Sequence, residues 1–352
     1  MVPQPTVFDY NLPSGSIANQ PVTPRDHSKL MVIDRNSGHI DNLHFFDLVD
    51  ILTKNDVLVL NQTKVFPARL IGHKTTGGKV EILLLRQINA STWIGLSHPG
   101  LKINQTLLFK SDLTAKIIDA NKSTGEVTIE FNFLGQEFLK ILYDIGQTPT
   151  PPYIHNCQPE DIVRHQYQTV YAKESGSAAA PTAGLHFTKN LLHKLKAKGI
   201  QIEFITLHVG LGTFQPLKSE NLITGKLHHE TYEITKATAD NLNLAKLSGK
   251  RIIAVGTTTA RTLETSSVLI PTKGETDLFI YPPYQFKFID SLITNFHLPQ
   301  SSLLMLVTAF CYYPNTNFKF TDFKSSIISQ AYLSAIKSDY RFFSFGDAMW
   351  IK

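Results

Sequence analysis

The sequence predicts a mixed α/β fold in which a region of short strands separates two regions of α/β character. From Tyr153 onward, predicted helices end at a glycine and lead into apolar strands, an alternation typical of an α/β layer. Between about Arg69 and Asp144 short strands follow one another closely, which favours a small barrel or sandwich. The stiff, proline-rich segment 147–153 predicts a domain boundary.

The elements of the first two regions follow from apolar runs and turn residues. Strands are expected at Lys29–Asp34 and Asp56–Leu60, with a short helix over Phe45–Leu52 between them. In the second region, Arg69–His73 and Lys79–Arg86 flank the sequence TTGG, which is a hairpin signal. Further short strands are expected, ending near Phe131.

The third region contains two predicted helix–glycine–strand units. In the first, Thr188 caps a helix that runs to Lys198 and is followed by a strand over Ile200–Val209. In the second, a helix over Ala237–Leu247 precedes a strand over Arg251–Val255. Gly199 and Gly249 supply the helix ends.

Composition restricts the class of protein. The chain has 352 residues, 42% hydrophobic and 18% charged, and no apolar run approaches the ~20 residues that span a bilayer. The N-terminus lacks the features of a signal peptide, and two cysteines are too few for a disulfide framework. We therefore expect a cytoplasmic protein without a membrane partner.

The net charge is +5, from 34 basic and 29 acidic residues. This mild excess permits a nucleic-acid partner bound through its phosphates. A basic protein with no polyanionic partner is an equally good interpretation of the charge alone.

Two glycine-bearing segments suggest the walls of a ligand site. Ser175–Phe187, which reads SGSAAAPTAGLHF, has no charge and little bulk before Leu185, so a ligand can approach its backbone closely. Leu207–Phe214 follows about twenty residues later and also contains a histidine and two glycines. Its Gly-x-Gly lacks the third glycine and the helix of a dinucleotide fingerprint, which argues against a Rossmann cofactor.

A third segment, Val255–Glu264, reads as a strand, a tight turn and a helix. The free N–H groups at the start of the helix, together with Arg261, suit a carboxylate or phosphate. The alternative is an ordinary capped turn with Arg261 in a surface ion pair.

Histidines and acids provide the candidate acid–base groups. His186, His208 and His297 lie in the third region together with Glu230, and no HExxH pattern occurs. Most single histidines are simply hydrogen-bonded core or surface residues, and most carboxylates are solvated. Tyr284 belongs to a rigid Tyr-Pro-Pro-Tyr segment that suits base stacking or core packing equally well.

Long motifs spread in order over almost the whole chain resemble the S-adenosylmethionine:tRNA ribosyltransferase-isomerase family of the queuosine pathway. They are Phe8–Pro13, Arg25–Leu30, Asp56–Lys64, Pro67–Arg69, Thr76–Glu81, Tyr167–Ala172, Ala180–Phe187, Leu207–Phe214, Gly256–Glu264, Asn295–Pro299 and Tyr340–Met349. Departures from the family pattern are few. They are the basic 163–165 segment, Pro283 in place of a glycine, and Gln300 in place of a lysine.

The resemblance implies a fold and an activity. The fold is a discontinuous α/β catalytic domain, residues 1–68 and 150–352, with an inserted β-barrel domain, residues 69–149. The activity moves the ribosyl part of S-adenosylmethionine onto the 7-aminomethyl-7-deazaguanine wobble base of tRNA. It forms epoxyqueuosine and releases adenine and methionine, and no metal is implied.

The resemblance and the residue chemistry together give expected roles. Proton transfer is assigned to His186, His208 and Glu230. Phosphate or base contacts of the tRNA are assigned to Arg69, Lys79, Tyr284 and His297. Binding of S-adenosylmethionine is assigned to Pro181, Thr182, Gly184, Phe187, Gly210, Gly212, Phe214, Thr257 and Arg261.

Two other classes of function remain open from the residues alone. One is a metal-dependent hydrolase or lyase that uses His186, His208 and His297. The other is an RNA-binding module without catalytic activity.

Overall fold

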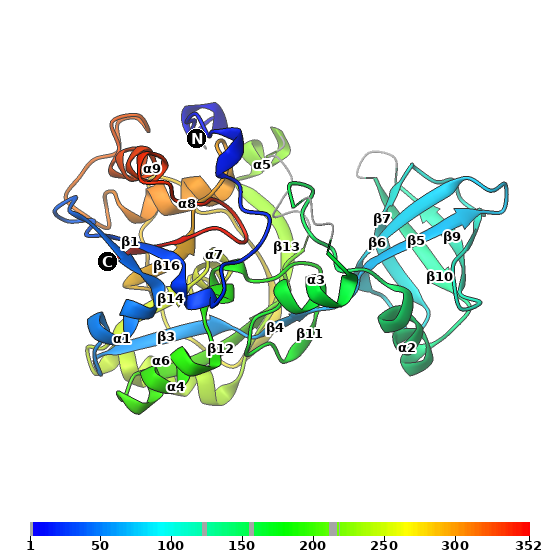
Figure 1. The fold of residues 1–352 in the computed structure, drawn as a ribbon, viewed down its shortest axis with the longest axis horizontal. Helices are drawn as coiled ribbons and strands as arrows, with labels where there is room; N and C mark the ends of the chain where they lie inside the picture. Colours follow the sequence, from blue (N-terminus) through cyan, green and yellow to red (C-terminus); the bar gives the residue numbers. More distant parts are fainter. Residues whose placement is uncertain (1–2, 122–124, 155–157, 211–216, 218) are drawn as a thin grey trace.

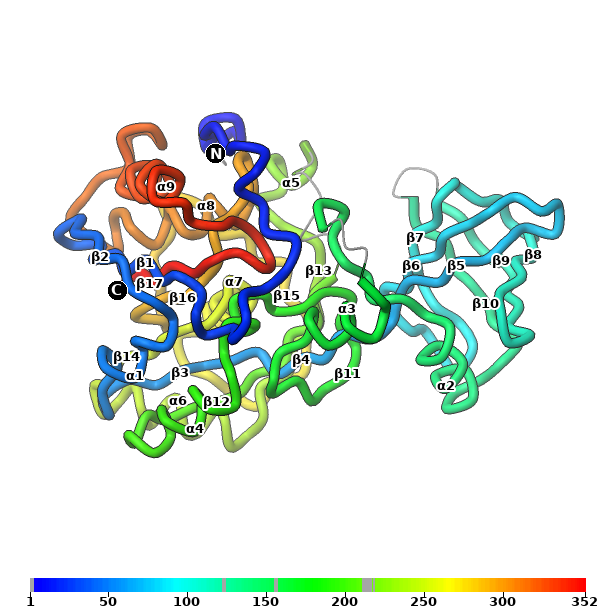
Figure 2. The backbone as a smooth tube through the Cα atoms, viewed as in Figure 1, coloured from blue at the N-terminus to red at the C-terminus, as the bar shows by residue number. Residues whose placement is uncertain are grey.

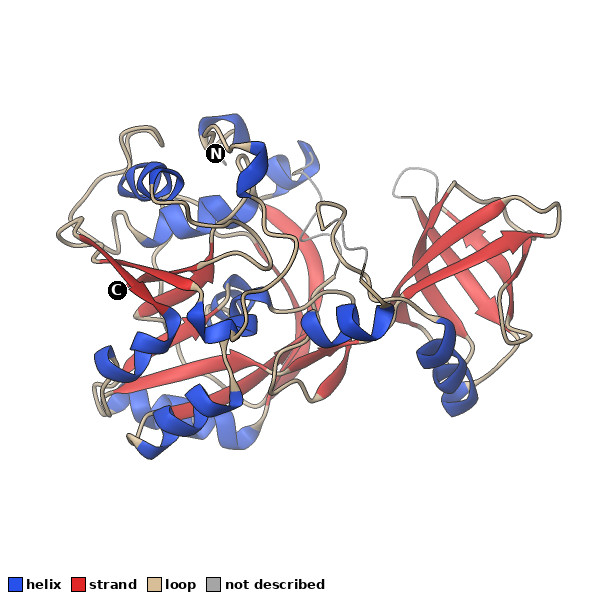
Figure 3. Ribbon diagram, viewed as in Figure 1, coloured by secondary structure: helices blue, strands red, loops and turns tan. Residues whose placement is uncertain are grey.

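A computed structural model describes residues 3–121, 125–154, 158–210, 217 and 219–352 of the chain. Figure 1 shows a larger α/β body and a smaller β-barrel beside it. Figure 3 shows that helices cover the sheet of the body, whereas the barrel is almost entirely strands. The predicted fold class, an α/β domain with a barrel, is confirmed.

The body is built on a mixed sheet with nine strands among the described residues, in the order β15-β13-β12-β3-β14-β16-β17-β1-β2. The four central strands β12, β3, β14 and β16 are parallel. The strand bounds, in sheet order, are Thr272–Leu278, Lys226–Ile234, Gln201–Leu207, Asp56–Asn61, Arg251–Val255, Ser291–Asn295, Ala348–Ile351, Lys29–Ile33 and Ile40–His44.

The sequence of the central strands explains their position. All six residues of β3 are buried, as expected for a parallel strand covered on both faces. Its side chains alternate between two cores, with Val57 and Val59 on one face and Leu58 and Leu60 on the other. Each apolar residue of this strand therefore stabilises one of the two helical layers.

Helices of different size cover the sheet. The longer ones are α4 (Lys189–Ala197), α6 (Lys236–Leu247), α8 (Ser302–Phe310) and α9 (Ile327–Lys337), each capped by a serine or threonine that accepts a backbone N–H bond. The shorter ones are α1 (Leu48–Ile51), α3 (Glu160–Gln166), α5 (Ser219–Thr224) and α7 (Thr257–Leu263).

The two ends of the chain meet in the sheet. Strand β17 runs parallel to β1 and antiparallel to β16, so it lies between an early strand and a late one. Figure 2 shows the blue and red segments side by side at this place. The C-terminus therefore completes a sheet that the N-terminus begins.

The barrel closes in the order β10-β7-β6-β5-β8-β9. Inward residues such as Val80, Ile82 and Leu84 alternate with more exposed ones along β6, and Phe138 and Leu142 of α2 (Gly135–Ile145) join the same core. The strands β5 to β10 span Arg69–Lys74, Lys79–Gln87, Thr92–His98, Thr106–Leu108, Thr114–Ala120 and Glu126–Phe131.

The connections into and out of the barrel are joined to each other. Arg69 and Gln147 exchange two backbone hydrogen bonds, of 3.1 and 2.8 Å. Next to them, the short strands β4 (Thr63–Val65) and β11 (Glu174–Ser177) pair in parallel. We propose that the domain boundaries lie here, with 1–68 and 150–352 in one unit and 69–149 in the other.

The predicted elements agree with the structure apart from small shifts. The helix expected over Phe45–Leu52 is a 3-10 turn, Phe45–Asp47, followed by α1. The strand expected to end at Val209 ends at Leu207. None of the helices in the described part of the chain is long and apolar enough to cross a membrane.

Gly184 gives a direct test of the packing beneath the small-residue segment. A Cβ atom at this position would overlap the Tyr171 hydroxyl, so Gly184→Ala should lower the free energy of unfolding by about 1–3 kcal/mol, measured by urea unfolding. Gly15→Ala is the control, because a Cβ atom there meets open space. Equal stabilities of the two variants would contradict this packing.

Candidate functional site

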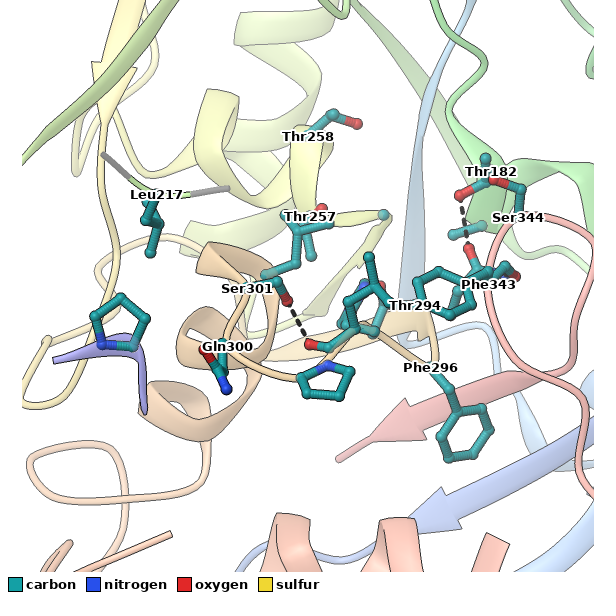
Figure 4. Close-up of a pocket in the computed structure, with 18 of the residues that line it drawn as sticks. Thr182, Leu217, Thr257, Thr258, Thr294, Phe296, Gln300, Ser301, Phe343 and Ser344 are labelled. Atoms are coloured by element: carbon teal, nitrogen blue, oxygen red, sulfur yellow. Dashed lines mark hydrogen bonds between the residues drawn. The ribbon is translucent and has the colours of Figure 1, made fainter. Parts of the chain in front are cut away.

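A cavity of about 620 Å³ opens where two central strands end. It lies beyond the carboxyl ends of β14 and β16, which is the usual place for a ligand in an open α/β sheet. Figure 4 shows Thr182 and Ser344 on one side and Thr257 and Ser301 on another. The lining combines hydroxyl-bearing residues with apolar ones such as Leu217, Leu222 and Phe343, which suits a small molecule with polar and apolar parts.

The first wall of the cavity is the segment Ala180–Ala183. Its small side chains leave the backbone near the cavity, as the sequence predicted. The bulkier end of the segment turns inward: Phe187 is fully buried and packs edge-on against Phe45, with ring centroids 4.9 Å apart. Of the predicted wall, Ser175–Phe187, only the middle part, Ala180–Ala183, therefore lines the cavity.

The second wall is the turn from β14 into α7. Gly256 has φ +92°, a backbone conformation that favours glycine, and Thr257 and Thr258 follow it along the cavity. An added Cβ atom at Gly256 would lie 3.7 Å from the Ala183 Cβ atom. The two walls are therefore in close contact, and the cavity lies beside that contact.

His297 is the predicted histidine that lines the cavity. Its Nε2 atom lies 3.0 Å from the Thr294 hydroxyl, and its backbone N–H donates a 2.9 Å hydrogen bond to the Tyr332 hydroxyl oxygen. Burial lowers the pKa of the His297 imidazole to about 3, so the ring is neutral near pH 7. The neutral ring keeps one unprotonated nitrogen, and its lowered pKa makes it a weak base.

His186 lies directly behind the first wall. Its two ring nitrogens are hydrogen-bonded, Nδ1 with the Ser28 hydroxyl at 2.8 Å and Nε2 with the Asn295 amide at 3.1 Å. Burial, followed by the charges of Arg341 and Arg25, lowers the pKa of His186 to about 3. It does not belong to the residues that line the cavity.

The other two expected proton-transfer residues also lie away from the cavity lining. His208 is half-buried beside Gly176, and its Nδ1 atom is 2.8 Å from the Thr63 hydroxyl. Burial lowers its pKa. Glu230 is buried and accepts a 2.7 Å hydrogen bond from Arg261.

The sequence Val255–Glu264 suggested that Arg261 binds an anionic ligand. In the structure Arg261 instead forms an ion pair with Glu230. The carboxylate accepts from Arg261 through one oxygen and from the backbone of Gly210 through the other, at 3.1 Å. The guanidinium Nε also donates to the Leu278 carbonyl, at 3.1 Å. Arg261 is thus held in a buried ion pair, not the surface pair considered above, and it does not line the cavity.

The expected tRNA contacts lie in different parts of the molecule. Arg69 pairs with Glu81 at 3.3 Å at the entrance to the barrel, and Lys79 is exposed at the start of β6. Tyr284 packs on Phe286 with its hydroxyl 3.4 Å from Glu264. Gly212 and Phe214 lie outside the described residues, so the expectation for them stays a prediction.

The cavity also contains residues that the sequence reasoning did not single out. Asn295 is the last residue of β16 and Ser301 follows that strand, within or next to a motif that was noted only as part of the resemblance. Phe343 and Ser344 come from the segment before β17, and Gln4–Thr6 from the N-terminus. Their distance in the sequence conceals the fact that they meet. The usable signals were the motifs Asn295–Pro299 and Tyr340–Met349, the second of which contains Phe343 and Ser344.

Comparison with known proteins gives the family. The family model described as "Queuosine biosynthesis protein" matches residues 6–351. The chain belongs to the queuosine biosynthesis protein family. It is therefore an enzyme of the ribosyltransferase-isomerase class that acts in queuosine biosynthesis.

Individual relatives match this family member over nearly its full length. Proteins named S-adenosylmethionine:tRNA ribosyltransferase-isomerase from Moorella thermoacetica and Clostridioides difficile are 48% and 46% identical, each covering 98% of both chains. The crystal structure of S-adenosylmethionine tRNA ribosyltransferase from Thermotoga maritima is 36% identical, with a TM-score of 0.54 over 98% of this chain and 100% of that one. The comparisons give no support to a metal-dependent hydrolase or lyase.

The buried ion pair of this queuosine-family enzyme should be costly to break. Glu230→Ala leaves the Arg261 charge buried without a carboxylate, so the free energy of unfolding should fall by about 3–5 kcal/mol in urea unfolding. Asp240→Ala is the control, because its pair with Lys236 is exposed and its loss should change stability by less than about 1 kcal/mol. Similar losses in both variants would contradict the buried pair.

The lowered pKa of His186 predicts how stability depends on pH. Below about pH 6.5 this histidine is protonated in the unfolded chain. In the folded chain it stays unprotonated until about pH 3. The free energy of unfolding therefore falls as pH falls through that range. His186→Gln should reduce the slope by about 1.4 kcal/mol per pH unit, measured by urea unfolding between pH 4.5 and 6.

The control for this slope is His193→Gln, at an exposed histidine of α4. Its slope should match that of the unsubstituted protein. An unchanged slope in His186→Gln would show that the buried imidazole titrates in the folded state.

Proposed function

We propose that this enzyme transfers the ribosyl part of S-adenosylmethionine to the 7-aminomethyl-7-deazaguanine wobble base of tRNA. It then isomerises the sugar, which gives epoxyqueuosine with release of adenine and methionine. The observation that carries the proposal is the whole-chain match to relatives named for this co-substrate and for tRNA. No metal takes part in the proposed reaction.

The cavity supports S-adenosylmethionine as the small molecule. Its volume of about 620 Å³ lies within the range of pockets that enclose molecules of this size. Of the residues expected to contact the co-substrate, Pro181, Thr182 and Thr257 line it. In this proposal the other described candidates do not contact the co-substrate but stabilise the two walls. They are Gly184, Phe187, Gly210 and Arg261.

The chemistry needs a base and an acid. The sulfonium charge acidifies neighbouring C–H bonds, so a neutral imidazole can remove a proton there, and adenine leaves more easily once it is protonated. His297 is the histidine that lines the cavity, and burial keeps its imidazole neutral near pH 7, the form a base requires, while lowering its basicity. We therefore assign proton transfer to His297 and give His208 and Glu230 no direct contact with the reacting atoms.

The tRNA is proposed to bind through its phosphates. The net charge of +5 favours this contact, and Lys79 on the outside of the barrel is free to reach a phosphate. Arg69 and Tyr284 have protein partners and serve mainly to hold the domain connection and the body core. The wobble base would enter the cavity from a single-stranded loop.

The test is release of adenine from S-adenosylmethionine in the presence of tRNA that carries the aminomethyl precursor base. We expect adenine and an epoxyqueuosine-containing tRNA from the unsubstituted protein, and turnover reduced by about 10²-fold or more in His297→Gln. His193→Gln, on the exposed face of α4, is the matched control and should retain full turnover. A folded protein that releases no adenine would overturn the proposal.

A further inference from the structure

Asn295, which lines the cavity, lies at the centre of a chain of hydrogen bonds that runs from Thr182 to the residues behind the wall. Its Oδ1 atom is 2.9 Å from the Thr182 hydroxyl, and its Nδ2 atom is 3.1 Å from His186 Nε2. The other nitrogen of His186 lies 2.8 Å from the Ser28 hydroxyl. Thr182 lines the cavity and is partly exposed, whereas Ser28, His186 and Asn295 are buried.

The direction of this chain is set by one backbone carbonyl. Asn295 Nδ2 lies 3.2 Å from the carbonyl oxygen of Phe343, which can only accept a hydrogen bond. The atom of Asn295 that faces it must therefore be the NH₂ group, and the amide oxygen must face Thr182. The Thr182 hydroxyl then has only one possible role toward Asn295, which is to donate its hydrogen.

The carbonyl of Phe343 is itself fixed. Phe343 has φ +70°, an uncommon conformation for a residue with a side chain, and its carbonyl also accepts a 3.0 Å bond from Gly346 N–H. A Cβ atom at Gly346 would overlap the backbone of Arg341 and Phe342, so the turn requires glycine. The orientation of Asn295 is thus built into the backbone.

The same logic fixes the proton on His186. Because the second N–H of Asn295 donates to Nε2, that nitrogen carries no proton and the proton is on Nδ1, where it is donated to Ser28. The lowered pKa of the ring agrees with a neutral imidazole. His186 therefore has no free nitrogen with which to serve a ligand.

We propose that His186 is a positioning residue that acts through Asn295 to hold the Thr182 hydroxyl as a hydrogen-bond acceptor toward the cavity. The hydroxyl hydrogen is committed to Asn295, so only the lone pairs of the Thr182 oxygen remain for a ligand. The ligand group at this point must therefore be an N–H or O–H donor. An unprotonated carboxylate or a bare ring nitrogen is disfavoured there, because two acceptors would face each other.

The identity of the donor group rests on the proposed function, because it assumes that the ligand is S-adenosylmethionine. S-adenosylmethionine carries three kinds of donor: the amino group of adenine, the ribose hydroxyls and the ammonium of the methionine part. Each of the three can donate a hydrogen bond to the Thr182 hydroxyl oxygen. The methionine carboxylate is excluded from this position by the same reasoning.

Binding measurements on Thr182 variants test the inference. By titration calorimetry, Thr182→Val should weaken S-adenosylmethionine binding by about 3- to 10-fold, the effect of one lost hydrogen bond, while Thr182→Ser stays within about twofold. His186→Ala should also weaken binding, with partial rescue in His186→Gln, whose amide oxygen can accept from Asn295. In a Thr182→Val background, His186→Ala should have little further effect, because the two act in one chain. Fully additive effects would overturn the inference.

Analogues of S-adenosylmethionine distinguish the three donors. We would compare an N6-dimethyl analogue, 2′- and 3′-deoxy analogues and an analogue without the α-amino group. The analogue that lacks the Thr182 partner should bind the unsubstituted protein and Thr182→Val equally well. If Thr182→Val weakens the binding of every analogue by the same factor, Thr182 accepts from none of these donors and the inference fails.

The hydrogen-bond direction can be tested without any ligand. Nitrogen-15 NMR of the histidine-labelled full chain, assigned with His186→Gln, should show His186 protonated at Nδ1 and not at Nε2. The opposite tautomer would overturn the inference. If the unsubstituted protein binds no S-adenosylmethionine and releases no adenine, the proposed function fails, whereas the tautomer result still decides the direction of the chain.

Discussion

The position of strand β17 determines how the site is assembled. Ala348 is paired with Leu30 of β1 on one side and with Asn295 of β16 on the other. The residues just before β17 therefore meet the end of β16 and the residues just before β1. Phe343, Asn295 and Ser28 converge for this reason, although more than 300 residues separate the first from the last along the chain. Asp347 reinforces the register by accepting from the backbone N–H groups of Lys29 and Arg341.

Much of the fold could be predicted from local patterns. The apolar run of Asp56–Asn61 predicts a buried strand, Thr188 a helix start, and the TTGG hairpin a strand-rich insert, and each is confirmed. The pairing of β17 with β1 could not be predicted in this way, because it joins the two ends of the chain and no local pattern specifies it. The strand itself is only four residues long, which gives a weak periodic signal.

The site was predictable at the level of segments but not of side chains. The small residues of Ala180–Ala183 do form a cavity wall. Composition could not show that the nearby His186 faces the protein core and not the cavity. Arg261 of α7 looked like an anion ligand because its buried partner, Glu230, lies 31 residues away on strand β13. A charged residue near the start of a helix looks the same in sequence whether its partner is a ligand or the protein itself, and only the tertiary contact decides.

The barrel enters and leaves the body through one pair of residues, Arg69 and Gln147, whose backbones are hydrogen-bonded to each other. An insertion with touching ends leaves the strand order of its host unchanged, since the host chain resumes almost where it was interrupted. In evolutionary terms, such a module can be acquired in a single event by an ancestor that already had a complete sheet. The arrangement of the chain is therefore compatible with insertion of the barrel into an existing sheet.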